Sequence, residues 1–171
     1  MMIKTKRFIL RPYGKSDEKS LVENINDWKV TQFMSNIPYP YTLKDARKWI
    51  KKCIKNTKKT NKTRIDFAVD INGEIVGGID LHNIEKHKAE IGYWLTRKLW
   101  NKGIMTEALR IMTNYGFNEL KLKRISATVD PKNKSSIFVL EKNKYKREGL
   151  LRDYAYKSGK YVDRFMYAKL K

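Results

Sequence analysis

The sequence has few of the residues that crosslink a chain or anchor it in a membrane. It contains one cysteine, Cys53, so no internal disulfide can form, which is typical of the reducing cytoplasm. Its two histidines, His82 and His87, form no motif with cysteine, so a zinc site is not expected. No apolar run is long enough to cross a bilayer, and residues 1–8 lack the apolar segment of a signal peptide. We therefore expect a soluble cytoplasmic protein without a metal ion.

Acidic residues are also scarce relative to basic ones. The chain has 38 Lys plus Arg against 18 Asp plus Glu, which gives a formal net charge of +20. Such a charge attracts RNA, ribosomes and phosphorylated cofactors, and it repels polycations. The alternative explanation is a general lysine bias, since most of the excess is lysine, which lacks the planar fork by which arginine binds phosphate. The composition leaves both explanations open.

Regular patterns predict one packed domain over residues 1–171, of the α+β class with about seven strands. Apolar alternation on both sides of Asn72-Gly73 predicts a hairpin with a type I′ turn. Thr42 and Asp45 match a capping pair and predict the start of a helix. Strands are expected at 3–12, 65–71, 75–81, 89–96, 124–129, 145–150 and 161–170, and helices at 15–26, 28–35, 43–57, 104–115 and 135–142.

Residues 90–109 form a predicted strand, loop and helix in succession. The first turn of a helix has N–H groups without intrahelical partners, and these groups and the helix dipole suit a phosphate or pyrophosphate. Gly103 permits a close backbone approach before the helix that begins at Ile104, and Lys102 and Arg97 add positive charge. By spacing alone, a plain strand-to-helix connection is the alternative.

This segment resembles the acetyl-CoA-binding motif of the GNAT superfamily, in the version found in RimJ/RimL-type N-acetyltransferases. Further short matches follow in the family's order along nearly the whole chain, and their order carries the resemblance. They are residues 5–12, 37–42, Gly77-Gly78, 91–95, Asn133 with Ser136, and 140–142. The resemblance implies a GNAT fold, in which a mixed central sheet has splayed central strands and is flanked by helices.

The resemblance also implies where acetyl-CoA would bind. The pantetheine arm would lie between the splayed strands 89–96 and 124–129, with its thioester held by the backbone. The implied residues are Trp94, Leu95 and Thr96 for pantetheine and thioester, Asn133 for the arm, and Asn101, Lys102, Gly103, Ile104, Met105 and Thr106 for the pyrophosphate.

Two stretches depart from the family pattern. In the loop the family has Gln or Arg, then Gly, then Gly or Ala, whereas this chain has Trp100, Gly103 and Met105. One backbone-approach position is therefore a glycine, and a bulkier contact from Met105 is expected. After the short helix the family's Gly-Phe is Lys144-Tyr145, a change that affects packing more than chemistry.

Acetyl transfer requires a proton donor for the leaving thiolate. Many GNAT enzymes have a tyrosine acid where this chain has Leu140, and RimJ/RimL-type enzymes lack it as well. The resemblance implies that Ser136 is the donor instead, and the alternative is that Ser136 caps or lines the short helix. Cys53 falls on the apolar face of a predicted helix, so we expect it to be a core residue rather than an acetyl carrier.

The candidate base is Glu90, acting directly or through water. It precedes the expected thioester site on its strand, where burial would raise its pKa toward neutrality. The alternative is an outward-facing carboxylate that pairs with Lys88 or Arg124. Asp80 and His82 on the preceding strand are weaker candidates for the same role.

The expected acceptor is the α-amino group at a protein N-terminus. Its pKa is near ~7.8 against ~10.4 for lysine, so deprotonating lysine costs about 3.5 kcal/mol more. Direct attack in a ternary complex then needs no strong base. The +20 charge disfavours polyamines, and the basic helix 43–57 suits a substrate presented on a ribosome. Two alternatives remain: a GNAT enzyme for a small-molecule amine, for which no acidic run is present, and a non-catalytic GNAT domain that binds RNA or a ribosome.

Overall fold

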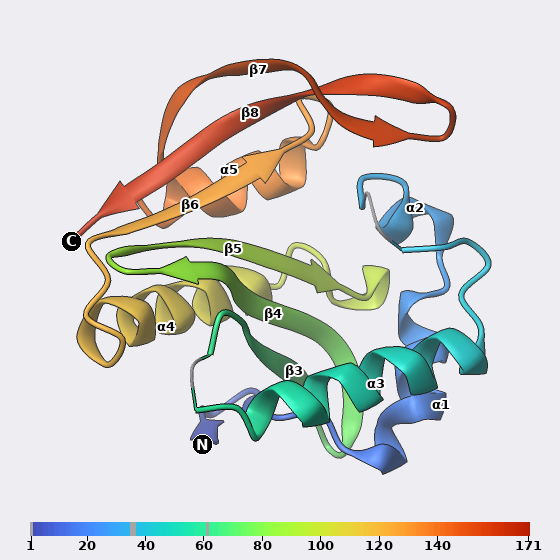
Figure 1. Ribbon diagram of the computed structural model, residues 1–171. Coiled ribbons are helices and arrows are strands. Elements are labelled where there is room, and N and C mark those ends of the chain that lie inside the picture. Colours follow the sequence, from blue (N-terminus) through green and yellow to red (C-terminus); the bar gives the residue numbers. More distant parts are fainter. Residues whose placement is uncertain (1, 35–36, 61) are drawn as a thin grey trace.

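The computed structural model describes residues 2–34, 37–60 and 62–171. In this described part, eight strands form one open sheet in the order β1-β2-β3-β4-β5-β6-β8-β7 (Figure 1). The α+β class and the mixed sheet flanked by helices are therefore confirmed, with one strand more than expected.

The additional strand comes from the N-terminal segment 3–12. The structure divides it into β1 (Ile3–Lys4) and β2 (Ile9–Arg11), which pair as an antiparallel hairpin. Thr5 forms the turn, because its hydroxyl accepts a hydrogen bond from the N–H of Phe8 at 3.0 Å and its own N–H donates to the Phe8 carbonyl at 3.0 Å. A side chain that satisfies its own backbone in this way interrupts a strand.

The next three strands form an antiparallel meander: β3 (Ile65–Ile71), β4 (Glu74–Glu85) and β5 (Lys88–Leu95). The turn between β3 and β4 has φ of 55° at Asn72 and 86° at Gly73. Positive φ at both central positions is the requirement of a type I′ turn, so the predicted hairpin is confirmed.

Strands β5 and β6 (Arg124–Val129) form a parallel pair that separates. Their pairing ends where Glu90 lies opposite Ser126, although β5 continues to Leu95 and β6 to Val129. The expected splay between the central strands is therefore present, and it leaves one edge of each strand without a neighbouring strand.

The sheet ends in a long hairpin of β7 (Lys146–Lys157) and β8 (Lys160–Leu170), and β8 also pairs with β6. The turn is at Ser158 and Gly159, as predicted, with φ of 48° and 83°. Strand β7 extends beyond the predicted segment 145–150 because its pairing resumes after an irregularity in the register.

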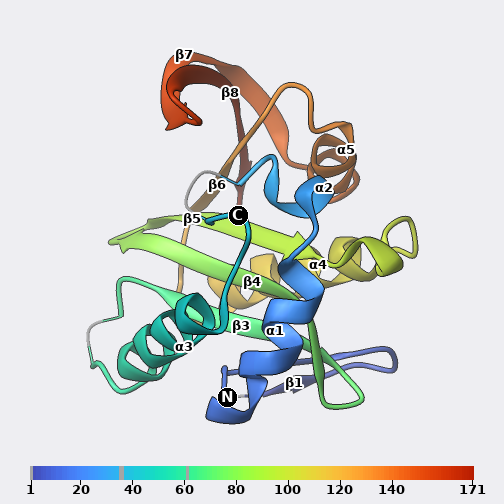
Figure 2. The same ribbon diagram turned by 90° about the vertical axis from the view of Figure 1, so that its right-hand side faces the viewer.

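Helices cover both faces of the sheet (Figure 2). On one face lie α1 (Glu18–Ile25) and α3 (Leu43–Thr57), and on the other lie α4 (Ile104–Asn118) and α5 (Lys134–Lys142). The predicted cap of α3 is confirmed, since the Asp45 carboxylate accepts from the N–H of Thr42 at 3.0 Å.

Three short helical segments complete the fold: η1 (Lys15–Asp17), α2 (Trp28–Thr31) and η2 (Arg97–Leu99). The predicted helix 28–35 is thus shorter in the structure, and its last residue, Ser35, lies outside the described residues. Lys157 of β7 donates to the carbonyl of Thr31 at 3.1 Å, so the end of α2 is tied to the terminal hairpin. None of the described helices is long and apolar enough to cross a membrane.

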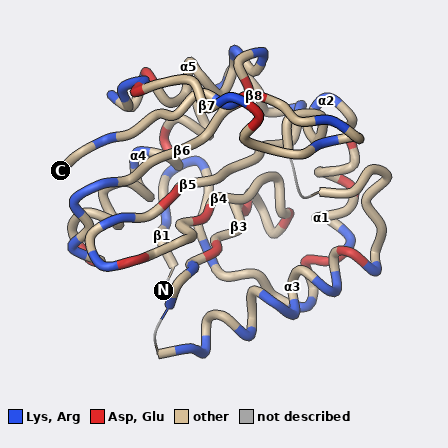
Figure 3. The backbone as a smooth tube through the Cα atoms, turned by 45° about the horizontal axis from the view of Figure 1, so that its top comes forward, with Lys and Arg blue, Asp and Glu red and all other residues tan. Residues whose placement is uncertain are grey.

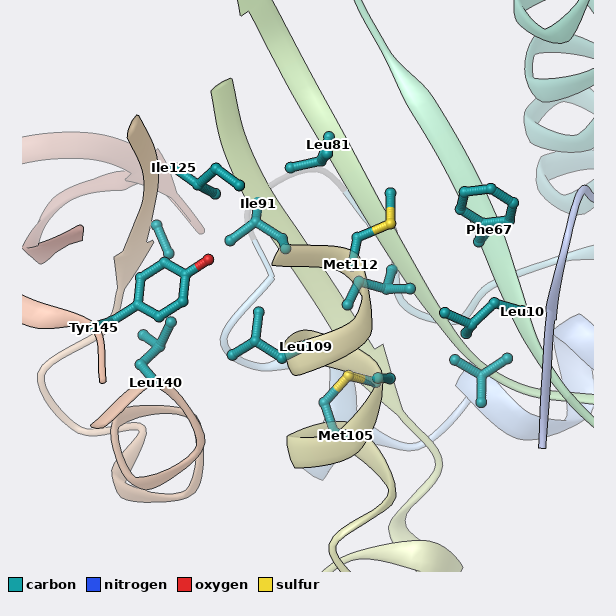
Figure 4. Close-up of a cluster of buried hydrophobic side chains, with 14 of the residues drawn as sticks. Leu10, Phe67, Leu81, Ile91, Met105, Leu109, Met112, Ile125, Leu140 and Tyr145 are labelled. Atoms are coloured by element: carbon teal, nitrogen blue, oxygen red, sulfur yellow. The ribbon is translucent and has the colours of Figure 1, made fainter. Parts of the chain in front are cut away.

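Each helical layer buries its own apolar cluster against the sheet. Met105, Leu109 and Met112 of α4 pack against one face, as Figure 4 shows. On the opposite face Ile50 and Cys53 of α3 share a buried cluster with Leu21 and Ile25 of α1. Cys53 is therefore a core residue, as predicted, and burial raises the pKa of its thiol.

Candidate active site

A cavity of ≈ 1800 Å³ crosses the sheet where β5 and β6 separate. Its lining includes Met105 and Ser136 on the face covered by α4 and α5. It also includes Tyr13, Trp49 and Asp80 on the face covered by α1 and α3. The splay thus connects the two faces of the molecule, and ligands entering from opposite sides can meet within the sheet.

The edge of β5 that faces this gap carries backbone groups that β4 does not use. The N–H of Thr96 donates to a β4 carbonyl at 2.8 Å. Because amides alternate in direction along a strand, Trp94 also points to β4, whereas Tyr93 and Leu95 point to the gap. The Leu95 carbonyl accepts from the indole N–H of Trp100 at 2.8 Å. The Leu95 N–H is therefore the backbone group of this residue that remains available in the gap.

The loop before α4 presents further backbone donors. Asn101 and Gly103 adopt left-handed conformations with φ of 59° and 73°, and Lys102 between them is exposed. The N–H of Glu107 donates to the Gly103 carbonyl at 3.1 Å, and glycine has no side chain to cap the helix. Within the described chain no hydrogen bond uses the N–H groups of residues 104–106. These donors lie together at the positive end of the helix dipole.

Arg7, in the turn between β1 and β2, holds this loop from outside. Its guanidinium donates to the Lys102 carbonyl at 2.8 Å and to the Gly103 carbonyl at 3.3 Å, and it pairs with the Glu107 carboxylate at 2.6 Å. The ion pair offsets a negative charge in the first turn of α4, where an anion would bind. Arg7 is not among the predicted site residues, because its only signal in the sequence is its place in the opening match to the family.

The two unusual loop residues have roles in packing. Trp100, besides closing the turn after β5, packs against both apolar clusters. The Met105 side chain is 5% exposed and lies in the core under α4 (Figure 4). The core therefore takes up the side chain that was expected to make a bulkier contact, and the Met105 N–H has no hydrogen-bond partner among the described residues.

The departure after α5 is also explained by packing. Lys144 adopts a left-handed conformation with φ of 65°, at the position where the family has glycine. Tyr145 is buried, and its hydroxyl lies 2.8 Å from the Thr113 hydroxyl of α4. The helix thus ends in the geometry that a glycine would adopt without strain.

Ser136 lies in the first turn of α5 with its hydroxyl 2.8 Å from the hydroxyl of Tyr93. The cap of α5 is Asn133, whose side chain accepts from the Ser136 N–H at 3.1 Å. The Ser136 hydroxyl is therefore not needed for capping. Burial raises the pKa of Tyr93, so both hydroxyls keep their protons at neutral pH. Tyr93 appeared in the sequence only as part of a family match.

Glu90 pairs with β4 rather than with a surface cation. Its carboxylate accepts from the Asn83 amide at 3.0 Å and lies 3.6 Å from Nε2 of His82. The His82 contact is the main cause of a lowered pKa of Glu90, which corrects the expected rise. The alternative partners are also wrong, because Lys88 and Arg124 bind other carboxylates.

The Glu90 contact is one end of a polar network across three strands. His82 Nδ1 lies 2.7 Å from Asp80, and Arg64 binds Asp80 at 3.1 Å and Asp66 at 2.6 Å. The Asp80 hydrogen bond is the largest cause that raises the pKa of His82 to about 9. No acidic run signalled this cluster, because strand register brings its members together. The described residues contain no group of three or more His, Cys, Asp or Glu side chains placed to hold a metal ion.

Comparison with known proteins agrees with this geometry. Residues 7–146 match the family model described as an acetyltransferase (GNAT) domain. The chain is 34% identical over 169 residues to the uncharacterized N-acetyltransferase p20 of Bacillus licheniformis. The alignment covers 98% of this chain and 94% of that protein. A GNAT-family acetyltransferase from Bacillus anthracis superposes with a TM-score of 0.84 at 31% identity, over 99% of this chain and 98% of that one.

The fold is also that of RimL, a ribosomal L7/L12 α-N-protein acetyltransferase solved with coenzyme A. That structure superposes with a TM-score of 0.88 at 23% identity, over 99% of this chain and 98% of that one. The family match spans most of the chain, and the relatives match along nearly its whole length. This chain therefore belongs to the GNAT family of acetyl-CoA-dependent N-acetyltransferases.

Proposed function

We propose that the enzyme acetylates the α-amino group at a protein N-terminus, such as that of a ribosomal protein, and that residues 1–171 act as one domain. The supporting observation is the cavity that crosses the sheet between β5 and β6. Acetyl-CoA bound from the α4 and α5 side would meet an amine bound from the α1 and α3 side. This arrangement suits direct attack in a ternary complex, because the sheet positions both reactants.

The proposed cofactor site consists mainly of backbone donors. The unpaired N–H groups of residues 104–106 suit a pyrophosphate at the start of α4. The free edge of β5 suits the amide-rich pantetheine arm, and the Asn133 amide nitrogen remains available after its oxygen caps α5. Bound there, acetyl-CoA supplies an activated acetyl group. The proposed residues are Trp94, Leu95, Thr96, Asn101, Lys102, Gly103, Ile104, Met105, Thr106 and Asn133.

The proposed catalytic residues are Ser136 and Glu90. Ser136 donates a proton to the leaving thiolate, and the Tyr93 hydroxyl beside it can replace that proton. Glu90 receives the proton of the amine indirectly. Asp80, which lines the cavity, takes the proton first, and water carries it on to Glu90. His82 is already protonated at neutral pH, so its two ring N–H groups hold both carboxylates in place and it accepts no proton itself.

The choice of a protein N-terminus is supported by chemistry and by charge. An α-amine loses its proton about 3.5 kcal/mol more readily than a lysine side chain, and Glu90, with its lowered pKa, is a weak base. The outer face of α3 carries exposed lysines, which Figure 3 shows along the helix. Such a face suits association with ribosomal RNA in the cytoplasm.

A small cationic amine is the second candidate acceptor. The sequence offered no acidic run for such a substrate, but the folded chain places Asp66 and Asp80 in the lining of the cavity. Carboxylates at this position favour any protonated amine that is narrow enough to enter.

Mass spectrometry of peptide mixtures incubated with enzyme and acetyl-CoA tests the proposal. We expect one acetyl group on the N-terminal α-amine of unblocked peptides and none on matched peptides with a blocked N-terminus. Release of coenzyme A should follow the same pattern in a thiol assay. Modification confined to lysine side chains or small amines would reject the N-terminal acceptor while leaving the enzyme an N-acetyltransferase.

A further inference from the structure

Two carboxylates of the sheet line the cavity on the α1 and α3 side. Asp66 and Asp80 are direct partners across β3 and β4, so their side chains project from the same face of the sheet. Asp66 is 7% exposed, and the side chain of Asp80 is 18% exposed. Arg64 binds one oxygen of each, which keeps the pair together despite its like charges.

One oxygen of this pair lacks a donor. Oδ1 of Asp66 accepts from Arg64, but Oδ2 is buried and has no hydrogen-bond partner among the described residues. A buried carboxylate oxygen without a donor is costly, on the order of 1–3 kcal/mol. Burial accordingly raises the pKa of Asp66. A donor that brings a positive charge would satisfy the oxygen and stabilise the charged form.

The network as a whole also lacks a cation. At neutral pH, Arg64 and protonated His82 face three carboxylates, those of Asp66, Asp80 and Glu90. One negative charge is therefore left over inside a protein whose net charge is +20. Lysines 48 and 52 of α3 also line the cavity, but they are exposed to solvent, which screens their charge.

The surroundings of the pair suit an alkyl group that carries a charge. The rings of Tyr13 and Trp49 pack edge to face, with their centroids 6.5 Å apart. Both rings line the cavity together with Asp66 and Asp80. The Trp49 ring already lies 5.1 Å from the Arg64 guanidinium, so the two rings suit the apolar stem of a ligand and leave its charge to the carboxylates. Gly92 leaves Asp80 accessible from the β5–β6 gap, because an added Cβ there would lie 3.2 Å from Oδ1 of Asp80.

We infer that Asp66 and Asp80 bind the amino group of the acceptor as an ammonium ion. The substrate class is therefore aliphatic amines that are protonated in solution, and weakly basic aromatic amines are poor acceptors. This inference rests on the proposed acetylation of a primary amine, and it assigns the residues that select the amine. Asp80, in contact with His82, is also placed to accept the proton that the ammonium must lose before attack.

Calorimetry on the enzyme saturated with coenzyme A tests the binding site without turnover. The probe is dimethylbutylammonium, which carries one N–H donor and a positive charge and forms no stable acetyl product. The neutral control ligand is the tertiary alcohol in which a carbon atom bearing a hydroxyl group replaces the N–H centre of the probe. We expect Asp66→Asn and Asp80→Asn each to weaken binding of the ammonium roughly tenfold or more. Glu85→Gln, which removes an exposed carboxylate of β4 outside the network, should leave binding unchanged.

Asp66→Glu guards against a trivial loss of structure, because it keeps the charge and should retain most of the affinity. Equal binding of the ammonium by wild type and both Asn variants, or equal binding of ammonium and alcohol, would overturn the inference. The outcome is independent of the peptide experiment. If ammonium binding depends on Asp66 and Asp80 but no peptide is acetylated, the N-terminal acceptor fails and the binding site stands.

Discussion

The hydroxyl of Tyr93 lies 2.8 Å from the hydroxyl of Ser136 and also donates to the Ser136 carbonyl at 3.2 Å. These contacts join β5 to α5 across the cavity. They place two neutral hydroxyl groups, which are hydrogen-bonded to each other, beside the gap between the splayed strands. A proton given up by the Ser136 hydroxyl can therefore be replaced from the Tyr93 hydroxyl.

We predict that Ser136→Ala lowers kcat roughly 100-fold with little change in KM for acetyl-CoA, because the variant loses a proton donor but no cofactor contact. Tyr93→Phe should lower kcat less, roughly tenfold, since Ser136 keeps its hydroxyl. Ser135→Ala is the control, because Ser135 is an exposed hydroxyl that also lines the cavity but has no hydrogen bond to Tyr93. Steady-state release of coenzyme A provides the measurement, and a wild-type kcat for Ser136→Ala would remove Ser136 from the chemistry.

Arg7→Met should raise KM for acetyl-CoA roughly fivefold to tenfold and change kcat little. The variant frees the carbonyl groups of Lys102 and Gly103 and leaves the charge of Glu107 unpaired beside the proposed phosphate site. Lys6→Met removes a neighbouring exposed charge and serves as the control. The double variant Arg7→Met/Glu107→Gln separates the two causes. Full rescue would mean that Arg7 only neutralises Glu107 and does not hold the loop.

Stability should fall on the alkaline side of neutrality because of His82. Its pKa is raised from 6.5 to about 9 in the folded state, so the folded protein holds a proton that the unfolded chain has released between these pH values. We expect the free energy of unfolding to decrease by about 1–2 kcal/mol over this window, since water screens a partly exposed side chain. Urea titrations at several pH values measure it. His82→Gln should flatten the profile, and an unchanged slope would contradict the assignment.

Gly78→Ala should destabilise the fold by about 2–3 kcal/mol. An added Cβ would lie 2.4 Å from the Tyr13 hydroxyl and 2.5 Å from Nε1 of Trp94, and both rings are packed around this point. Gly149→Ala is the matched control, because nothing lies within 4 Å of its added Cβ. Thermal and urea unfolding of the two variants gives the comparison, and equal stabilities would show that Tyr13 and Trp94 can move aside.

Lys144→Gly should stabilise the protein by about 0.5–1 kcal/mol. Lys144 has φ of 65°, a conformation that costs an L-residue about 1–2 kcal/mol. Glycine avoids this cost, but it loses more conformational freedom on folding, which reduces the gain in stability. Its backbone, not its side chain, ends α5. Denaturant unfolding measures the change, and a lower stability of the variant would show that the Lys144 side chain makes a favourable contact.

Features that depend on a few neighbouring residues were predictable. The turn at Asn72 and Gly73 and the cap formed by Thr42 and Asp45 both occur as expected, because each is specified by residues within one turn. The N-terminal segment 3–12 was predicted less well. Its apolar pattern suits a strand throughout, and the local hydrogen bonds of Thr5 interrupt it.

From its sequence alone the chain was identified as a member of its family and its loop before α4 as a site for backbone donors, because both depend on residue order and on the geometry of a helix start. Only the tertiary structure brought together Asp66, Asp80 and Glu90, which lie on three different strands. It likewise paired Glu90 with His82 and thereby lowered a pKa that burial alone would have raised. Register between strands decides such contacts, and register is a property of the whole sheet.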